Sequence, residues 1–195
     1  NALCCLNFIH SADLMHRDIK PANIMVTNRD KIKILDFGIA KEQESSKTKT
    51  GTSMGTVDYM APEQYLDSKK VDQRADIYAL GLTFYEMLAG RLPWSGSLGE
   101  FEKLERKKKG DLGLPSKYYP NIPSTIERVV MRALEVNIRA RFPDIRTFKR
   151  ALKKAIENVG KQVERREPQN SPQPVEERKV TNSVFDDDKS SGFSF

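Results

Sequence analysis

The chain has 195 residues, and its 38% hydrophobic content is enough for the core of one ordinary domain plus an appendage. Its 33 Lys and Arg against 27 Asp and Glu give a net charge of +6. Both signs are interspersed along the chain, which favours an ordinary solvated surface and argues against a nucleic-acid-binding protein. No apolar run approaches the roughly 20 residues that cross a bilayer, so we expect no membrane segment in this chain.

The two cysteines, Cys4 and Cys5, are adjacent and flanked by apolar residues. We therefore expect small buried thiols rather than a disulfide, as in a reducing, cytoplasmic compartment. A membrane anchor beyond residue 195 of a longer protein stays open. His10 and His16 have no Cys, Asp or Glu at a ligand spacing, so we expect no zinc site.

The first third of the chain predicts a helix, a loop and a hairpin. Residues 2–10 suit a buried helix, and the start of the chain suggests a helix entered midway rather than a signal peptide. Strand-like runs at 24–26 and 31–35 flank a turn-forming Thr-Asn-Arg-Asp stretch. Residues 41–53 are polar and rich in Ser, Thr and Lys, which is typical of a functional loop.

Helices are expected to dominate the rest. The strongest pattern, at 75–88, should be the hydrophobic centre of the fold and should end at Gly90. An exposed basic helix at 100–109 should present Lys107, Lys108 and Lys109 as a solvated face, with docking of acidic partners as the less favoured alternative. Ser124 and Asp144 are expected caps of two further helices, the second reaching about residue 159.

Two short motifs carry the chemistry. The run His16-Arg17-Asp18-Ile19-Lys20-Pro21-Ala22-Asn23 is followed, after the hairpin, by Asp36-Phe37-Gly38. Phosphoryl transfer needs a carboxylate that orients the attacking hydroxyl, and oxygen ligands that hold Mg²⁺ on the ATP phosphates. Because the strands of a hairpin run out and return, Asn23 and Asp36 are expected at the same end of it.

These motifs, together with Ala61-Pro62-Glu63, Asp76 with Gly81, and Arg141, resemble the eukaryotic-type serine/threonine protein kinase family over residues 1–155. The resemblance implies an α+β, protein-kinase-like fold, of which this chain is the mainly helical C-terminal lobe with a small β-hairpin at the catalytic loop. Residues 1–159 would form that partial kinase domain, and 160–195 a disordered polar tail or linker.

The resemblance also implies roles for the site residues. Asp18 would be the catalytic base and Lys20 would steady the transferring phosphate. Asn23 and Asp36 would bind Mg²⁺, with Mn²⁺ as an alternative, and Met25 would lie under the adenine of ATP.

Other positions have implied structural or substrate roles. His16 and Phe37 would belong to the hydrophobic stack that aligns the two lobes, and Asp76 would anchor the backbone of the catalytic loop. Glu63 and Arg141 would form the ion pair that pins the activation segment to the helical lobe.

Lys20 and Gly55-Thr56 resemble the serine/threonine branch, where Thr56 would contact both the base and Lys20 near the acceptor hydroxyl. The sequence from Gly55 to Gln64 is similar to the corresponding segment of bacterial receptor-type kinases. The implied function is non-specific serine/threonine kinase activity on protein substrates in signal transduction, with self-association for autophosphorylation as a further expectation. The intact motif argues against a pseudokinase scaffold, the alternative reading.

Two further expectations follow from the family. Its Gly-rich loop and ATP-gripping lysine lie upstream of the catalytic loop, so the 195-residue chain alone should be inactive. The loop between Gly38 and Ala61 should also be a phosphorylation switch. Arg17 and Lys41 would bind the phosphate, and the expected acceptors are Thr48, Thr50 and Thr52.

Overall fold

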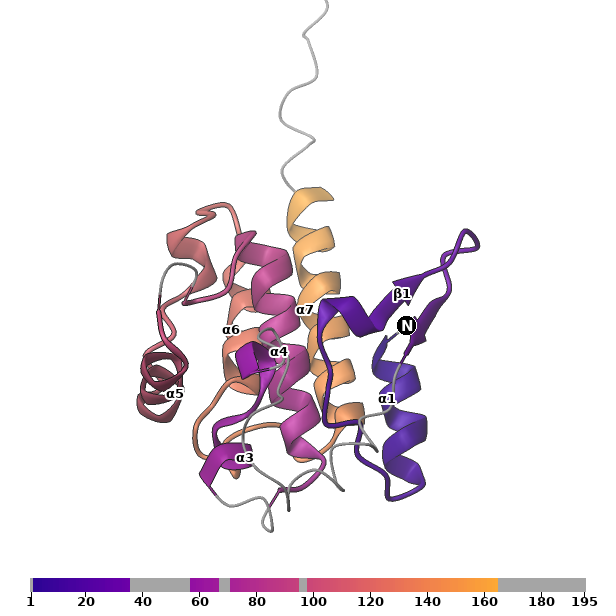
Figure 1. Cartoon of the computed structure of the whole chain (residues 1–195). Coiled ribbons are helices and arrows are strands. Elements are labelled where there is room, and N and C mark those ends of the chain that lie inside the picture. The colour runs from indigo at the N-terminus through magenta and orange to yellow at the C-terminus, as the bar shows by residue number, and fades with distance from the viewer. Residues whose placement is uncertain (1, 36–56, 67–70, 95–97, 165–195) are drawn as a thin grey trace, which may run out of the picture.

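The computed structural model describes residues 2–35, 57–66, 71–94 and 98–164. These ranges form a mainly helical unit with one small antiparallel sheet, as expected (Figure 1). In chain order the elements are α1 (Ala2–Ser11), η1 (Pro21–Asn23), β1 (Ile24–Val26), β2 (Ile32–Ile34), η2 (Val57–Tyr59), α3 (Pro62–Leu66), α4 (Arg74–Ala89), α5 (Glu100–Lys109), η4 (Pro115–Lys117), α6 (Ser124–Ala133) and α7 (Ile145–Glu164).

Helix α4 is the centre of the fold. In Figure 1 it lies between α5 on one side and α1 with the hairpin on the other. Ten of its sixteen residues are buried, because apolar side chains surround it instead of forming one stripe. The expected stop at Gly90 is confirmed, since this glycine has φ 69° and its N–H donates to Glu86 O at 2.8 Å.

Two apolar clusters meet on α4. One joins α4 to α1 and α7 through Leu6, Ile77 and Phe148. The other includes Tyr78, Leu82 and Trp94 and continues toward α6. Burial of this apolar surface is what holds α4 between its neighbours, so each residue anchored on α4 has a rigid base.

The hairpin forms where the alternation predicted it. β1 and β2 pair antiparallel with Met25 opposite Lys33, and Thr27 N donates to Lys31 O at 2.8 Å across the turn. Asp30 takes a positive φ of 54° in this turn, a conformation that Asp tolerates better than most residues. The second strand is one residue shorter at each end than the predicted 31–35 run.

Helix α7 begins after Asp144, whose Oδ1 accepts from Thr147 N at 2.7 Å as the predicted cap. The helix continues to Glu164, five residues beyond the expected boundary at 159. The remainder of the predicted tail lies outside the described residues. At α6 the cap prediction was wrong, because Ser124 is the first helical residue and Pro123 precedes it without a side-chain cap.

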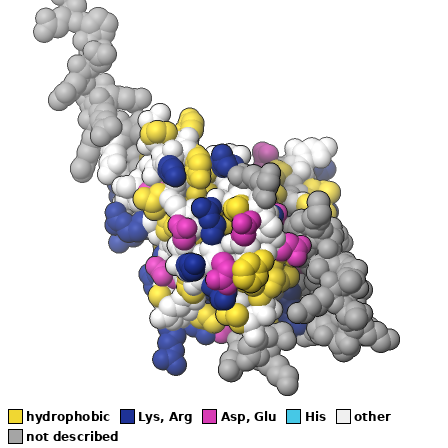
Figure 2. All heavy atoms as spheres, turned by 60° about the vertical axis from the view of Figure 1, so that its left-hand side comes forward, with side chains coloured by type: hydrophobic (Ala, Val, Ile, Leu, Met, Phe, Trp, Pro, Cys, Tyr) yellow, Lys and Arg dark blue, Asp and Glu magenta, His cyan; other side chains and the backbone are white. Residues whose placement is uncertain are grey.

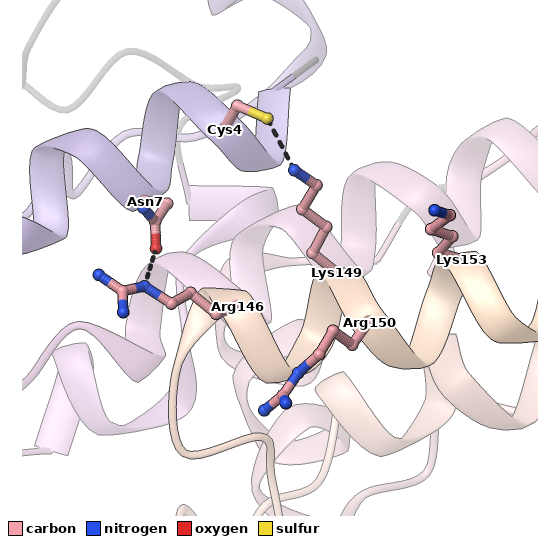
Figure 3. Close-up of a pocket in the computed structure, with 6 residues that line it drawn as sticks. All are labelled: Cys4, Asn7, Arg146, Lys149, Arg150 and Lys153. Atoms are coloured by element: carbon pink, nitrogen blue, oxygen red, sulfur yellow. Dashed lines mark hydrogen bonds between the residues drawn. The ribbon is translucent and has the colours of Figure 1, made fainter.

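The first and last helices lie side by side, and polar contacts join them (Figure 3). Lys149 donates to Cys4 Sγ at 3.0 Å, and Arg146 donates to Asn7 Oδ1 at 2.9 Å. The prediction that both cysteines are buried was wrong, because Cys4 is exposed and Cys5 is half-buried, each as a free thiol. The core face of α1 consists of Ala2, Leu3, Leu6, Ile9 and His10, and this spacing turns Cys4 outward.

The charged surface is mixed, in keeping with the sequence. On the face drawn in Figure 2, side chains of Lys and Arg alternate with those of Asp and Glu. Among the described residues, no helix is both long and apolar enough to cross a membrane.

The face of α5 departs from the prediction of a fully solvated basic stripe. Lys108 and Lys109 are exposed, but Lys107 is only 1% exposed. Lys107 is buried because its ammonium group contacts two backbone carbonyls and the Trp94 ring. The residues next to Lys107 in the sequence do not predict these contacts. A run of three lysines therefore divides between solvent and core.

Gly81 tests how tightly α4 is packed. A Cβ at this position would lie 3.0 Å from both Ala133 Cβ and Leu134 Cδ2. We expect Gly81→Ala to lower the free energy of unfolding by about 1–3 kcal/mol, because neither neighbour can yield without disturbing α6. Gly160→Ala is the matched control in open space on α7, where the same change should stabilise by about 0.5–1 kcal/mol. Urea unfolding of both variants measures the difference, and equal effects would contradict this account of the packing.

Candidate active site

Asp76, in the first turn of α4, binds the backbone of the loop that follows α1. Its side chain is 1% exposed, and it accepts the N–H groups of His16 (Oδ2, 2.8 Å) and Arg17 (Oδ1, 2.8 Å). The Nε2 atom of His10 lies 2.9 Å from the same Oδ2. A buried carboxylate needs hydrogen bonds to offset its desolvation, and here the loop backbone supplies them. One side chain of the core thus fixes residues 16 and 17.

The fixed backbone includes an unusual conformation at Arg17. Its φ is 63°, in the left-handed region that costs a residue with a Cβ about 1–2 kcal/mol. The hydrogen bond from its N–H to Asp76 compensates for this cost. Strain of this kind commonly marks functional loops, and the next residue is Asp18.

Asp18, Lys20 and Asn23 come together around one carboxylate. Lys20 Nζ and Asn23 Nδ2 each lie 3.1 Å from Asp18 Oδ2, and Asn23 Nδ2 also donates to Asp18 O at 2.8 Å. The turn η1 makes this approach local, because Asn23 N donates to Lys20 O at 3.0 Å and Pro21 fixes the first φ angle. A carboxylate, an ammonium group and an amide thus occupy one side of the loop.

The hairpin returns the chain to this cluster. Leu35, which directly precedes Asp36, donates its N–H to Asn23 O at 2.8 Å. The ring of His16 contacts Leu35 O through Nε2 at 3.0 Å. The end of the hairpin therefore lies against both the loop and Asn23, while Asp36 itself lies outside the described residues.

Glu63 and Arg141, which are 78 residues apart, form a bidentate ion pair with N–O distances of 2.7 and 2.8 Å. The Arg141 side chain is fully buried, donates further to Glu135 O, and lies 4.7 Å from the centre of the Tyr78 ring. Burial raises the pKa of the Tyr78 phenol, so this ring stays neutral beside the guanidinium. Breaking such a buried pair leaves an uncompensated charge, so the pair holds α3 to the helical core.

Several predicted site residues lie outside the described residues, namely Asp36, Phe37, Lys41, Thr48, Thr50, Thr52 and Thr56. Met25 is described on β1, where its side chain is 48% exposed. Sequence reasoning treated His10 only as a metal candidate and missed its contact with Asp76. A signal was available for the burial of His10, though not for its partner, since His10 lies four residues after Leu6 on the buried face of α1.

Comparison with known proteins assigns the class. The pattern of the protein kinase domain matches residues 1–155, and the chain therefore belongs to the protein kinase family.

The most similar relatives include the serine/threonine-protein kinase Pkn1 of Myxococcus xanthus, 39% identical over 77% of this chain and 22% of that protein. A probable serine/threonine-protein kinase PknB of Lactococcus lactis is 36% identical over 73% of this chain and 23% of its own length. The tyrosine-protein kinase MasK of Myxococcus xanthus is 38% identical over 72% and 22%. The chain thus spans less than a quarter of the length of these curated relatives.

We expect Asp76→Ala to lower the free energy of unfolding by about 2–5 kcal/mol, because it leaves the buried N–H of His16 and the half-buried N–H of Arg17 without their acceptor. Asp111→Ala, which removes a largely exposed carboxylate, is the control and should change stability by less than about 0.5 kcal/mol. Urea denaturation of both variants provides the comparison. A loss no larger for Asp76→Ala than for Asp111→Ala would refute the anchoring role.

Proposed function

We propose that the protein containing this chain is a serine/threonine protein kinase that transfers the γ-phosphate of ATP to hydroxyl groups of protein substrates in signal transduction. The observation that carries the proposal is the cluster of Asp18, Lys20 and Asn23 within 3.1 Å, on a loop anchored to the core by Asp76. Membership of the protein kinase family supports it.

In this proposal Asp18 orients the acceptor hydroxyl and accepts its proton. Its carboxylate is held on one side by the amide of Asn23 and by the ammonium of Lys20, so its direction is set before substrate binds. Lys20 is 20% exposed, which leaves it able to reach an incoming phosphate oxygen. Positioning and charge stabilisation are the main contributions that a kinase makes to phosphoryl transfer.

The donor set of the loop fits Mg²⁺. The side-chain amide nitrogen of Asn23 points at Asp18, so the amide oxygen of Asn23, Oδ1, faces the other way and can serve as a metal ligand. Leu35, which directly precedes Asp36, donates to Asn23 O, so the chain returns to Asn23 at this point. Oxygen ligands of this kind suit the ion. When bound, Mg²⁺ would neutralise charge on the ATP phosphates. Asn23 and Asp36 would hold it, and Met25 would lie under the adenine.

We further propose that the chain is the C-terminal lobe of the kinase. The exposed side chains of Met25 and Val26 on the hairpin support this, because they offer apolar surface for the nucleotide and for a preceding lobe. A Gly-rich loop and an ATP-gripping lysine would come from that lobe, so the isolated chain would be inactive.

The choice of acceptor residue is also part of the proposal. Lys20 favours serine and threonine, whereas the names of the relatives include both serine/threonine and tyrosine kinases. Phosphorylation of Thr48, Thr50 or Thr52, with the phosphate bound by Arg17 and Lys41, would be the switch.

We expect Asp18→Asn in the full-length protein to lower kcat by about 10²-fold or more, since an amide cannot accept the hydroxyl proton, while ATP affinity changes little. Asp30→Asn is the matched control: it removes a carboxylate from the exposed hairpin turn and keeps a residue that tolerates φ of 54°. Radiolabelled phosphate transfer followed by phosphoamino-acid analysis measures both rate and acceptor. Unchanged turnover in Asp18→Asn would sink the assignment, and phosphotyrosine as the sole product would overturn the serine/threonine specificity.

A further inference from the structure

Lys107 is an unusual lysine in this chain. It lies in the last turn of α5, yet only 1% of it is exposed, and its Nζ donates to two backbone carbonyls, Val57 O and Met60 O, each at 2.8 Å. The ammonium group also lies 4.6 Å from the centre of the Trp94 ring. Burying a charge is costly unless it is well paired, so this placement requires an explanation.

The two carbonyls explain it. Val57 and Met60 frame the short turn η2, which cannot satisfy its own carbonyls as a long helix would. Met60 N donates to Val57 O at 3.3 Å, and Lys107 supplies donors to Val57 O and Met60 O from a helix 50 residues away. A leucine at position 107 could fill the space but would remove the donor to Met60 O, a half-buried carbonyl, and one of the donors to Val57 O.

A second lysine on the same face of α5 strengthens the attachment. Lys103, one turn before Lys107, forms a 2.8 Å ion pair with Asp58, the middle residue of η2. Two lysines four residues apart on a helix repel each other. Lys103 and Lys107 nevertheless point toward the same turn, because each finds acceptor groups there. Helix α5 therefore holds η2 by one side-chain ion pair and two backbone contacts.

We infer that Lys107 is a positioning residue for phosphoryl transfer: its ammonium group fixes the chain between Thr56 and Glu63 by binding the carbonyl oxygens of Val57 and Met60. This inference rests on the proposed kinase function and on the role that the family resemblance implies for Thr56, near the acceptor hydroxyl. Val57 directly follows Thr56, and Glu63 is held by Arg141. Lys107 thus fixes the end of this stretch that adjoins the proposed substrate site.

The electrostatic surroundings of Lys107 agree with this role. Burial lowers the pKa of its ammonium group to about 7, while nearby Asp58 opposes the change and Lys103 adds to it. Tyr65 of α3 also faces the group, with its ring centre 6.0 Å away, and burial raises the pKa of that phenol so that it stays neutral. The carbonyl dipoles and the Trp94 ring favour the charged form, and a neutral amine at this position would still donate N–H groups to the two carbonyls.

The position of α5 predicts which kinetic constants change. The groups proposed to bind ATP lie on the catalytic loop and hairpin, which Asp76 holds from α4, whereas Lys107 holds only the segment after Thr56. Loss of Lys107 should therefore weaken substrate positioning and leave nucleotide binding intact. A general loss of structure would instead affect both.

The test uses the full-length protein with Lys107→Met, which keeps the length and apolar stem but removes the donors. We expect kcat/KM for a threonine peptide to fall about 10- to 100-fold, with KM for ATP unchanged within about twofold. Lys107→Arg, which keeps charge and donors, should recover part of the loss. Lys108→Met, an exposed neighbour on the same helix, is the matched control and should behave as wild type.

Hydrogen exchange provides a readout that needs no activity. Amide exchange over residues 57–66 should accelerate in Lys107→Met and not in Lys108→Met. Unchanged exchange, unchanged peptide kinetics, or equal losses for peptide and ATP would overturn the inference. Inactivity of the wild-type protein would instead contradict the proposed function, and the exchange result would then show whether the anchor itself exists.

Discussion

The carboxylate of Asp76 is the constraint on which the site depends. It lies on the most deeply buried helix, and it accepts hydrogen bonds from the backbone of a loop 60 residues earlier in the chain. Because α4 packs against α6, α7 and η2, the position of the carboxylate is set by the whole core. Through it the core determines where Asp18 lies, and the left-handed turn at Arg17 is part of that arrangement.

Two other long-range contacts also hold a loop or short helix against the core through a buried side chain. Arg141 binds Glu63, and Lys107 binds the turn η2, so α3 and its preceding residues are held from both the helical core and α5. In each case a buried side chain from a distant part of the chain is paired with hydrogen-bonding or charged groups of this segment. The fold thus places its buried charges where a loop must keep one conformation, which is the requirement of a site that works by positioning.

Sequence reasoning predicted the elements whose signals are local. The hairpin, the central helix with its stop at Gly90, and the cap at Asp144 each depend on residues within a few positions of one another. The cluster around Asp18 could be anticipated for the same reason, since its members lie within one short loop. The burial of Lys107 and the contact of His10 with Asp76 could not, because their partners are 50 and 66 residues away. Cys4 shows a third limit: its apolar neighbours suggested burial, whereas the helical spacing of the core face turns it outward.

A double-mutant cycle tests most directly whether Asp76 acts by placing Asp18. Phosphate transfer would be measured in the full-length protein for Asp76→Asn, Asp18→Asn and the double variant. If Asp76 serves to position the carboxylate of Asp18, the loss caused by Asp76→Asn should largely disappear when Asp18 is already changed. Losses that multiply in the double variant would show that the two residues act independently, and would contradict the account.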